Sequence, residues 1–225
     1  MVSFKTKDFI FVHFPKTGGM WFGDMWRQLK LGPVNKAPNL VGHKPAAYFK
    51  DWDKLPWVAV YRNPLNWYAS LYNYHVKMNW YWDPRLKGTS FERFVEICLE
   101  KQPMSKIWHN MVVKPKQEFG ALKAKPMKSG KLQLQLLPPP TYMIQYENMF
   151  EELEIVLHDI LGYDVTKEQL EALPKQNAHN HPGLRDRIYN NNVPALTPRL
   201  RERILEADAS IFEYYKNHDA VVAEW

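Results

Sequence analysis

Short, nearly continuous apolar runs alternate along the chain with longer amphipathic segments. The apolar runs are rich in β-branched and aromatic residues and lie at residues 7–14, 56–61 and 141–146. Runs of this length and composition predict buried strands. Because helical patterns separate them, the chain is expected to form an α/β domain whose central parallel sheet is flanked by helices in three layers.

Capping residues mark the expected helix boundaries. The first helix is predicted over 19–31, where Gly32-Pro33 follows, and the second from Asn63-Pro64 to about Lys77. A third begins at Thr89, with Glu92 in capping-box spacing, and a fourth runs from Asn148, with Glu151, to Gly162. Two more begin at Thr166, with Gln169, and at Thr197-Pro198. The last of these has apolar residues along one face at Leu200, Ile204, Ala207, Ile211 and Tyr215.

Length and composition predict one sizeable domain over residues 1–225. One segment, residues 114–140, departs from the pattern with six lysines and five prolines. It is expected to be a loop or hairpin insertion, either simply solvated or a lid over an anionic ligand. The formal net charge of +6 favours anionic partners without choosing among nucleotides, nucleic acids, acidic glycans and membrane surfaces.

The single cysteine, Cys98, excludes an internal disulfide and lies in a helical pattern, where a buried thiol is expected. The apolar run near the N-terminus is short and leads directly into Pro15-Lys16, unlike a signal peptide. No apolar stretch reaches 18 residues, so no transmembrane segment is expected. These features favour a cytoplasmic protein.

The first chemical motif is the strand, turn and helix of residues 9–26, with Pro-Lys-Thr-Gly-Gly at the turn. The first N–H groups of a helix lack partners and its dipole attracts anions, so such a turn is a general anion site. Gly18 and Gly19 permit a close approach, and Lys16 adds a positive charge. The Walker pattern is absent, which makes a P-loop nucleotide kinase a poor alternative. A plain turn with a surface lysine is the structural alternative.

A second motif follows the strand at 56–61. Arg62 stands at the carboxyl end of that strand, where open α/β sheets bind ligands, and Ser70 follows eight residues later. Both side chains can face one anion if they project from the same side of the helix. An ion-paired arginine and a surface serine are the structural alternative.

Together these segments resemble the sulfotransferases that use 3′-phosphoadenosine-5′-phosphosulfate (PAPS). The resemblance implies a P-loop NTPase-like sulfotransferase fold, with PAPS as co-substrate, the desulfated nucleotide PAP as product, and no metal. The matching segments, in order, are FPKTGGMW (14–21), GHKPAAYF (42–49), YRNPLNWYAS (61–70), YMIQYENMFEELEIVLHDILGYD (142–164) and LTPRLRERILEADASIFEYY (196–215).

The resemblance also implies roles for individual residues. Lys16 would stabilise charge on the leaving phosphate, and His43 would be the general base, although some glycan sulfotransferases use a carboxylate instead. The cofactor-binding set would comprise Lys16, Thr17, Gly18, Gly19 and Met20 around the 5′-phosphosulfate; Trp21 and Tyr146 at the adenine; Arg62 and Ser70 at the 3′-phosphate; and Arg185, in place of an absent R-K-G motif.

Besides the absent R-K-G motif, two departures from the family pattern bear on this interpretation. Gly19 and Met20 replace two threonines, so two hydroxyl donors are missing from the turn. Asn148 replaces the aspartate of the family's Y-E-D-L segment. The aromatic segment 72–85 is expected either to line an acceptor cleft or to pack in the core, with His75 as a second candidate base.

The expected activity is transfer of a sulfuryl group from PAPS to a hydroxyl or amine of a small-molecule, glycan or lipid acceptor. By analogy with phosphoryl transfer, positioning and electrostatics would supply most of the catalysis. The alternatives are a PAPS- or PAP-binding protein without turnover and a basic, aromatic-rich nucleic-acid-binding protein, although no nucleic-acid partner is expected. The histidines have no metal-site spacing, so no metal is expected either.

Overall fold

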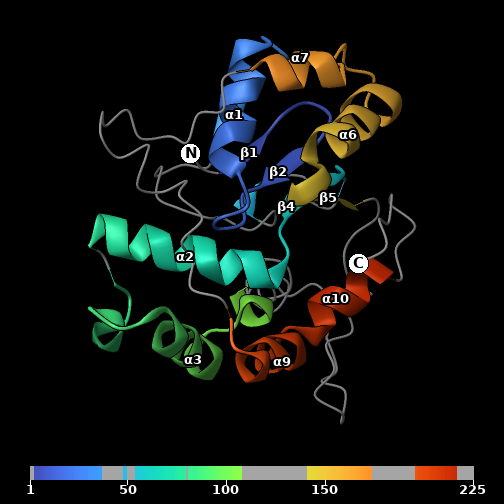
Figure 1. Cartoon of the computed structure of the whole chain (residues 1–225). Coiled ribbons are helices and arrows are strands. Elements are labelled where there is room, and N and C mark those ends of the chain that lie inside the picture. The colour runs from blue at the N-terminus through green and yellow to red at the C-terminus, as the bar shows by residue number, and fades with distance from the viewer. Residues whose placement is uncertain are drawn as a thin grey trace.

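The computed structural model describes residues 3–36, 48–49, 54–79, 81–107, 141–173 and 196–216. The described chain forms a five-stranded sheet with helices against both faces, which confirms the expected α/β class (Figure 1). In their order across the sheet the strands are β3 (Asn35–Lys36), β1 (Phe4–Lys5), β2 (Ile10–Val12), β4 (Trp57–Tyr61) and β5 (Thr141–Gln145).

The sheet is mixed, so the expectation of a parallel sheet was only partly right. The three predicted strands are parallel neighbours, β2 to β4 and β4 to β5. The other two strands run antiparallel, β1 to β2 and β3 to β1. Each of these two strands has only two residues, which is too short to give a periodic signal in the sequence.

Helices cover the two faces of the sheet in separate groups (Figure 1). One group is α1 (Gly19–Gln28), α6 (Met149–Glu154) with its π-helical continuation η5 (Ile155–Ile160), and α7 (Lys167–Ala172); the other is α2 (Pro64–Met78), α3 (Phe91–Lys101), α9 (Pro198–Ala207) and α10 (Ala209–Lys216). The 3-10 turns η2 (Pro84–Leu86) and η4 (Tyr146–Asn148) lie between these longer elements. None of the helices in the described ranges is long and apolar enough to cross a membrane.

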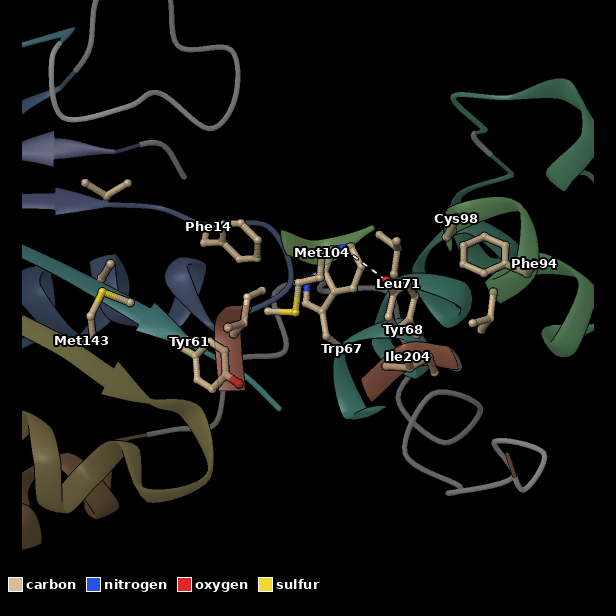
Figure 2. Packing of buried hydrophobic residues seen from close by; sticks show 14 of the residues in the cluster. Phe14, Tyr61, Trp67, Tyr68, Leu71, Phe94, Cys98, Met104, Met143 and Ile204 are labelled. Carbon is tan, nitrogen blue, oxygen red and sulfur yellow. Dashed lines mark hydrogen bonds between the residues drawn. The ribbon is translucent and has the colours of Figure 1, made fainter. Parts of the chain in front are cut away.

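Two cores follow from the alternation of side chains along the buried strands. Phe9 and Phe11 pack with α1 and α6, whereas Ile10 and Val12 pack with α2, α3 and α9. The core formed with α2, α3 and α9, called the second core below, is drawn in Figure 2, where Cys98 lies among apolar side chains. Cys98 is fully buried, as the sequence predicted, and burial raises its pKa to about 12.

One buried carboxylate joins distant parts of the second core. Asp208 accepts hydrogen bonds from the Tyr68 hydroxyl at 2.9 Å and from the Ser105 N–H at 2.7 Å. The Tyr68 oxygen in turn accepts from the N–H of Met104 at 3.1 Å (Figure 2). Burial raises the pKa of Asp208. Asp208 also separates α9 from α10, so the single C-terminal helix expected from the sequence is two helices.

The predicted caps had mixed outcomes. The Thr166–Gln169 capping box is present at α7. Ser90, not Thr89, caps α3, and the Thr89 hydroxyl instead donates to the carbonyl of Leu86. Asn148 makes no side-chain cap at α6, and its amide group donates to the Gln145 side chain.

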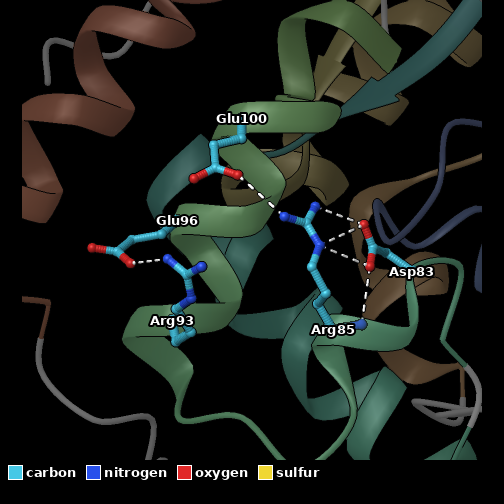
Figure 3. Close-up of polar contacts among 5 residues, drawn as sticks. All are labelled: Asp83, Arg85, Arg93, Glu96 and Glu100. Atoms are coloured by element: carbon cyan, nitrogen blue, oxygen red, sulfur yellow. Dashed lines mark hydrogen bonds and ion pairs between the residues drawn. The ribbon is translucent and has the colours of Figure 1, made fainter.

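Exposed ion pairs tie η2 to α3 and brace the α3 surface (Figure 3). Arg85 contacts Asp83 at 2.8 Å and Glu100 at 3.5 Å, and Arg93 contacts Glu96 at 2.8 Å. Hydrogen bonds from Arg85 lower the pKa of Asp83 to about 2. These surface cations are therefore neutralised locally by carboxylates of the same region.

Candidate functional site

The carboxyl ends of the three parallel strands meet at one edge of the sheet. The turn at 15–18 follows β2, Arg62 directly follows β4, and Tyr146 directly follows β5. This edge is the usual ligand site of open α/β sheets. The fold therefore brings three sequence-predicted positions to the same place.

The turn has a specific backbone shape. Lys16 and Gly18 both have positive φ, at 62° and 80°, and a non-glycine residue adopts such a φ only at a cost. The Thr17 hydroxyl donates to the carbonyl of Phe14 at 2.9 Å, which fixes the turn from within. Thr17 is 1 % exposed, so what it offers a ligand comes from its backbone.

Side chains from α2 and its N-terminal approach anchor the turn from outside. Trp67 Nε1 donates to the carbonyl of Pro15 at 2.8 Å, and Arg62 Nη1 donates to the carbonyl of Lys16 at 3.4 Å. Both bonds engage carbonyl oxygens. They hold the turn through its carbonyl acceptors and do not use the amide donors in the first turn of α1.

The N-terminus of α1 and that of α2 differ in how they are capped. Gly18 is the N-cap of α1, with no side-chain cap and no acidic residue in the first turn. At α2 the Asn63 side chain accepts from the Leu65 N–H at 2.9 Å. Glu147 adds a carboxylate there, accepting from the Asn63 N–H at 3.2 Å and from Asn66 Nδ2 at 3.1 Å. The start of α2 thus already has an anion, whereas the start of α1 has none from its own first turn.

Two cations stand beside this turn, each over an aromatic ring. The Arg62 guanidinium carbon lies 4.5 Å from the ring centre of Tyr146, and Lys16 Nζ lies 4.2 Å from that of Tyr74. Arg62 Nε is buried and has no hydrogen-bond partner within the described ranges. The guanidinium therefore keeps an unused donor beside the turn, in addition to its charge.

Ser70 lies on α2 between two residues that contact the site. Asn66, one turn earlier, binds Glu147, and Tyr74, one turn later, carries Lys16 over its ring. Residues four apart share one face of a helix. Ser70 is partly buried and shares this face of α2 with Asn66 and Tyr74, and its role at a 3′-phosphate stays a prediction.

The two glycines of the turn are each required by a neighbouring ring. A β-carbon on Gly18 would lie 2.9 Å from Cε2 of Tyr146, and one on Gly19 would lie 2.0 Å from Cδ2 of His13. Gly18 also has positive φ, which disfavours any side chain at that position. At Gly19 φ is not positive, and a side chain is disfavoured only because the His13 ring occupies the space. The departure from threonine at position 19 thus has a steric cause.

His13, which the sequence interpretation did not single out, therefore belongs to the site. It is 5 % exposed, its N–H donates to the Ser3 hydroxyl at 2.9 Å, and its ring stacks on Phe11. The available signal was a polar residue at the end of an apolar strand, three positions before Lys16. That signal was hidden because a strand end often carries a polar residue.

Other predicted residues are buried or exposed in ways that bear on their roles. Trp21 is 8 % exposed and packs against Phe150, so most of its ring is a core contact, and its stacking on adenine stays a prediction. Met20 is 37 % exposed at the first turn of α1. His75 is 1 % exposed and stacks on Tyr81, which places this second candidate base in the core.

His43, Arg185 and the segment 114–140 lie outside the described residues. Within the described ranges, no group of three or more histidine, cysteine, aspartate or glutamate side chains could hold a metal ion. A buried carboxylate does lie near the end of β5: Glu152 Oε2 accepts from the Gln145 N–H at 2.6 Å. Burial raises the pKa of Glu152 to about 7.

Comparison with protein-family models and with curated proteins found no match for this chain. Its function is therefore inferred from the geometry of this edge of the sheet and from the motifs described above.

Proposed function

We propose that the protein is a PAPS-dependent sulfotransferase with a three-layer, P-loop-like sulfotransferase fold. One observation carries the proposal: the N-terminus of α1 has no side-chain cap, and Arg62, which follows the next parallel strand, contacts the turn that precedes α1. A nucleotide with phosphate groups at both its 5′ and 3′ positions needs two neighbouring anion sites. The turn supplies one, and Arg62 with Ser70 supplies the other.

The start of α2 helps to divide these roles. Glu147 accepts from the N–H of Asn63, the N-cap of α2, and from the Asn66 side chain, so a 3′-phosphate at the start of α2 would meet a carboxylate. The 3′-phosphate is therefore assigned to the side chains of Arg62 and Ser70. The 5′-phosphosulfate is assigned to the amides of Gly18 and Gly19, where no acidic residue competes in the first turn.

In the proposed reaction an acceptor oxygen or nitrogen attacks the sulfur in line. A bond from sulfur to the acceptor forms while the bond from sulfur to the phosphate oxygen of PAPS breaks, and PAP leaves with the electron pair. Lys16 stabilises the negative charge that develops on PAP. A base takes the proton of the acceptor, and His43 remains the residue assigned to that step.

A second candidate function, nucleotide binding without turnover, is favoured by one observation. Positions 19 and 20 have no hydroxyl, and Met20 presents an exposed thioether at the first turn of α1. In contrast, the described arginines around α3 are paired with carboxylates, which weakens the case for a nucleic-acid-binding surface there.

Titration calorimetry with PAP tests the proposal, and transfer of labelled sulfate from PAPS to a panel of phenols, sugars and amines tests turnover. Lys16→Ala should weaken PAP binding by about tenfold or more, since a charge-assisted contact is worth about 1.5–3 kcal/mol. Lys30→Ala is the matched control, because Lys30 also has positive φ but lies exposed beyond the other end of α1.

Absence of PAP binding by the wild-type protein would contradict the proposal. PAP binding without transfer to any acceptor would favour the second candidate. Equal losses for Lys16→Ala and Lys30→Ala would show that binding does not involve the turn.

A further inference from the structure

Two consecutive residues after β5 contact two consecutive residues after β4. The two strands are parallel and paired along their whole length, so the residues that follow them leave the sheet side by side. The Tyr146 ring centre lies 4.5 Å from the guanidinium carbon of Arg62. One residue further along each segment, Glu147 Oε1 accepts from the Asn63 N–H at 3.2 Å. The exit of β5 thus holds Arg62 both by its side chain and by the backbone that follows it.

The Glu147 carboxylate fixes the peptide unit that joins Arg62 to Asn63. This unit is planar and contains the Asn63 N–H, so a partner for that N–H orients the whole unit. Both carboxylate oxygens lie near it, Oε1 at 3.2 Å and Oε2 at 3.4 Å. Oε1 also accepts from Asn66 Nδ2 at 3.1 Å, and the Asn63 side chain accepts from the Leu65 N–H at 2.9 Å. The backbone on the carboxyl side of Arg62 is therefore tied to both α2 and the exit of β5.

The Arg62 side chain is held in one orientation and keeps one donor unused. The guanidinium stands over the Tyr146 ring, and its Nη1 donates to the carbonyl of Lys16 at 3.4 Å. Its Nε is buried and has no hydrogen-bond partner among the residues that the structure describes. A buried donor without a partner costs free energy, so its presence indicates a place where a bound ligand supplies the acceptor. The direction of this donor is therefore what a positioning contact would protect.

We propose that Glu147 is a positioning residue for Arg62. By holding the peptide unit that follows Arg62, its carboxylate directs the guanidinium toward the 3′-phosphate without touching the ligand. A carboxylate in contact with the phosphate would instead repel it, since two negative charges at contact distance disfavour binding. The identity of the ligand as a 3′-phosphate rests on the proposed function, whereas the hold on Arg62 follows from the contacts within the protein.

A double-mutant cycle on PAP binding tests the positioning role. Glu147→Ala should weaken PAP binding by about tenfold in the wild-type background, because Arg62 loses its fixed direction. In the Arg62→Ala background the same substitution should change PAP affinity by less than about twofold, because no guanidinium is left to position. Glu154→Ala is the matched control: Glu154 Oε1 accepts from the Lys167 N–H at 3.0 Å, at the start of α7. This control should lose thermal stability without losing affinity for PAP.

Equal losses of affinity in the two backgrounds would overturn the proposal and make Glu147 only a structural cap of α2. Unchanged or tighter PAP binding by Glu147→Ala would overturn it too. Thermal unfolding checks that each variant is folded. If Glu147→Ala does not fold, Asn66→Ala takes its place in the cycle, because it removes one partner of the same carboxylate. Its loss of about threefold should vanish in the Arg62→Ala background, and a loss that persists there, or no loss at all, would overturn the proposal.

Hydrogen exchange in the ligand-free protein separates this inference from the proposed function. The buried Arg62 Nε–H should exchange about tenfold faster in Glu147→Ala than in the wild type and at the wild-type rate in Glu154→Ala, as NMR of the arginine side chains measures. An unchanged rate in Glu147→Ala would overturn the positioning role by itself. Faster exchange without PAP binding by the wild type would leave that role standing and remove the sulfotransferase proposal. PAP binding that does not depend on Glu147 would do the reverse.

Discussion

Arg62 Nη1 donates to the carbonyl oxygen of Lys16 at 3.4 Å, while the guanidinium lies over the ring of Tyr146 at 4.5 Å. One side chain therefore joins the ends of all three parallel strands, since Lys16 follows β2 and Tyr146 follows β5. Tyr146 in turn lies against Gly18. The cation, the aromatic ring and the turn form one contact unit.

The first prediction concerns the division of phosphate sites. Arg62→Ala should weaken PAP binding by about tenfold to a hundredfold, because a charge-assisted hydrogen bond is lost. Binding of AMP, which has no 3′-phosphate, should change by a few-fold only. Calorimetry with both nucleotides measures the difference. Similar losses for the two ligands would place Arg62 at the 5′ end or in the fold alone.

A second prediction tests the anchor of the turn. Trp67→Phe removes the bond from Nε1 to the Pro15 carbonyl and should lower the unfolding free energy by about 1–2 kcal/mol. It should also weaken PAP binding, because the turn loses an anchor. Trp26→Phe is the matched control: Trp26 Nε1 donates to the carbonyl of Gly32 at 2.9 Å, at the other end of α1. That variant should lose stability without losing affinity, as denaturant melts and calorimetry can show.

The third prediction separates backbone strain from steric exclusion. Gly18 and Gly88 both have positive φ, at 80° and 71°, but only Gly18 has a neighbour within 4 Å of its β-carbon position. Gly88→Ala should cost about 1–2 kcal/mol from strain alone. Gly18→Ala should cost more, because Tyr146 must move. Equal losses of unfolding free energy for the two variants in urea denaturation would mean that the Tyr146 ring moves aside without cost.

The fourth prediction concerns pH. Burial raises the pKa of Glu152 from 4.5 to about 7, so the folded protein holds this proton more tightly than the unfolded chain. The resulting stabilisation is fully present below pH 4.5 and is lost as the pH rises through about 7. Relative to Glu152→Gln, the wild-type unfolding free energy should fall over this range by up to about 3 kcal/mol. Parallel pH profiles of the two proteins would contradict this.

The main sheet could be predicted because its central strands are buried on both faces and are nearly continuously apolar. The expected strands at 56–61 and 141–146 match β4 and β5 within one residue. The short strands β1 and β3 could not be predicted, because two residues carry no periodicity. Their pairing depends on contacts with β2 and with each other, which local patterns do not encode.

The site was partly predictable for a similar reason. Lys16 and Arg62 follow predicted strands, and the carboxyl ends of parallel strands share an edge. The Glu147 cap of α2 was not foreseen, because it joins residues 84 apart in the chain. Gly19 was taken as a departure from a family pattern, and only the position of His13 shows that a ring requires it.

The hydrogen bonds to Asp208 have a consequence for the order in which the chain folds. Tyr68 and Ser105 find this acceptor 140 and 103 residues further along the chain. During synthesis these donors must stay hydrated until the C-terminal helices emerge and dock. Closing such long loops is slow relative to local helix formation. The layer of α2, α3 and α9 is therefore expected to complete late, after the β2–α1 unit that contains the turn has had time to form.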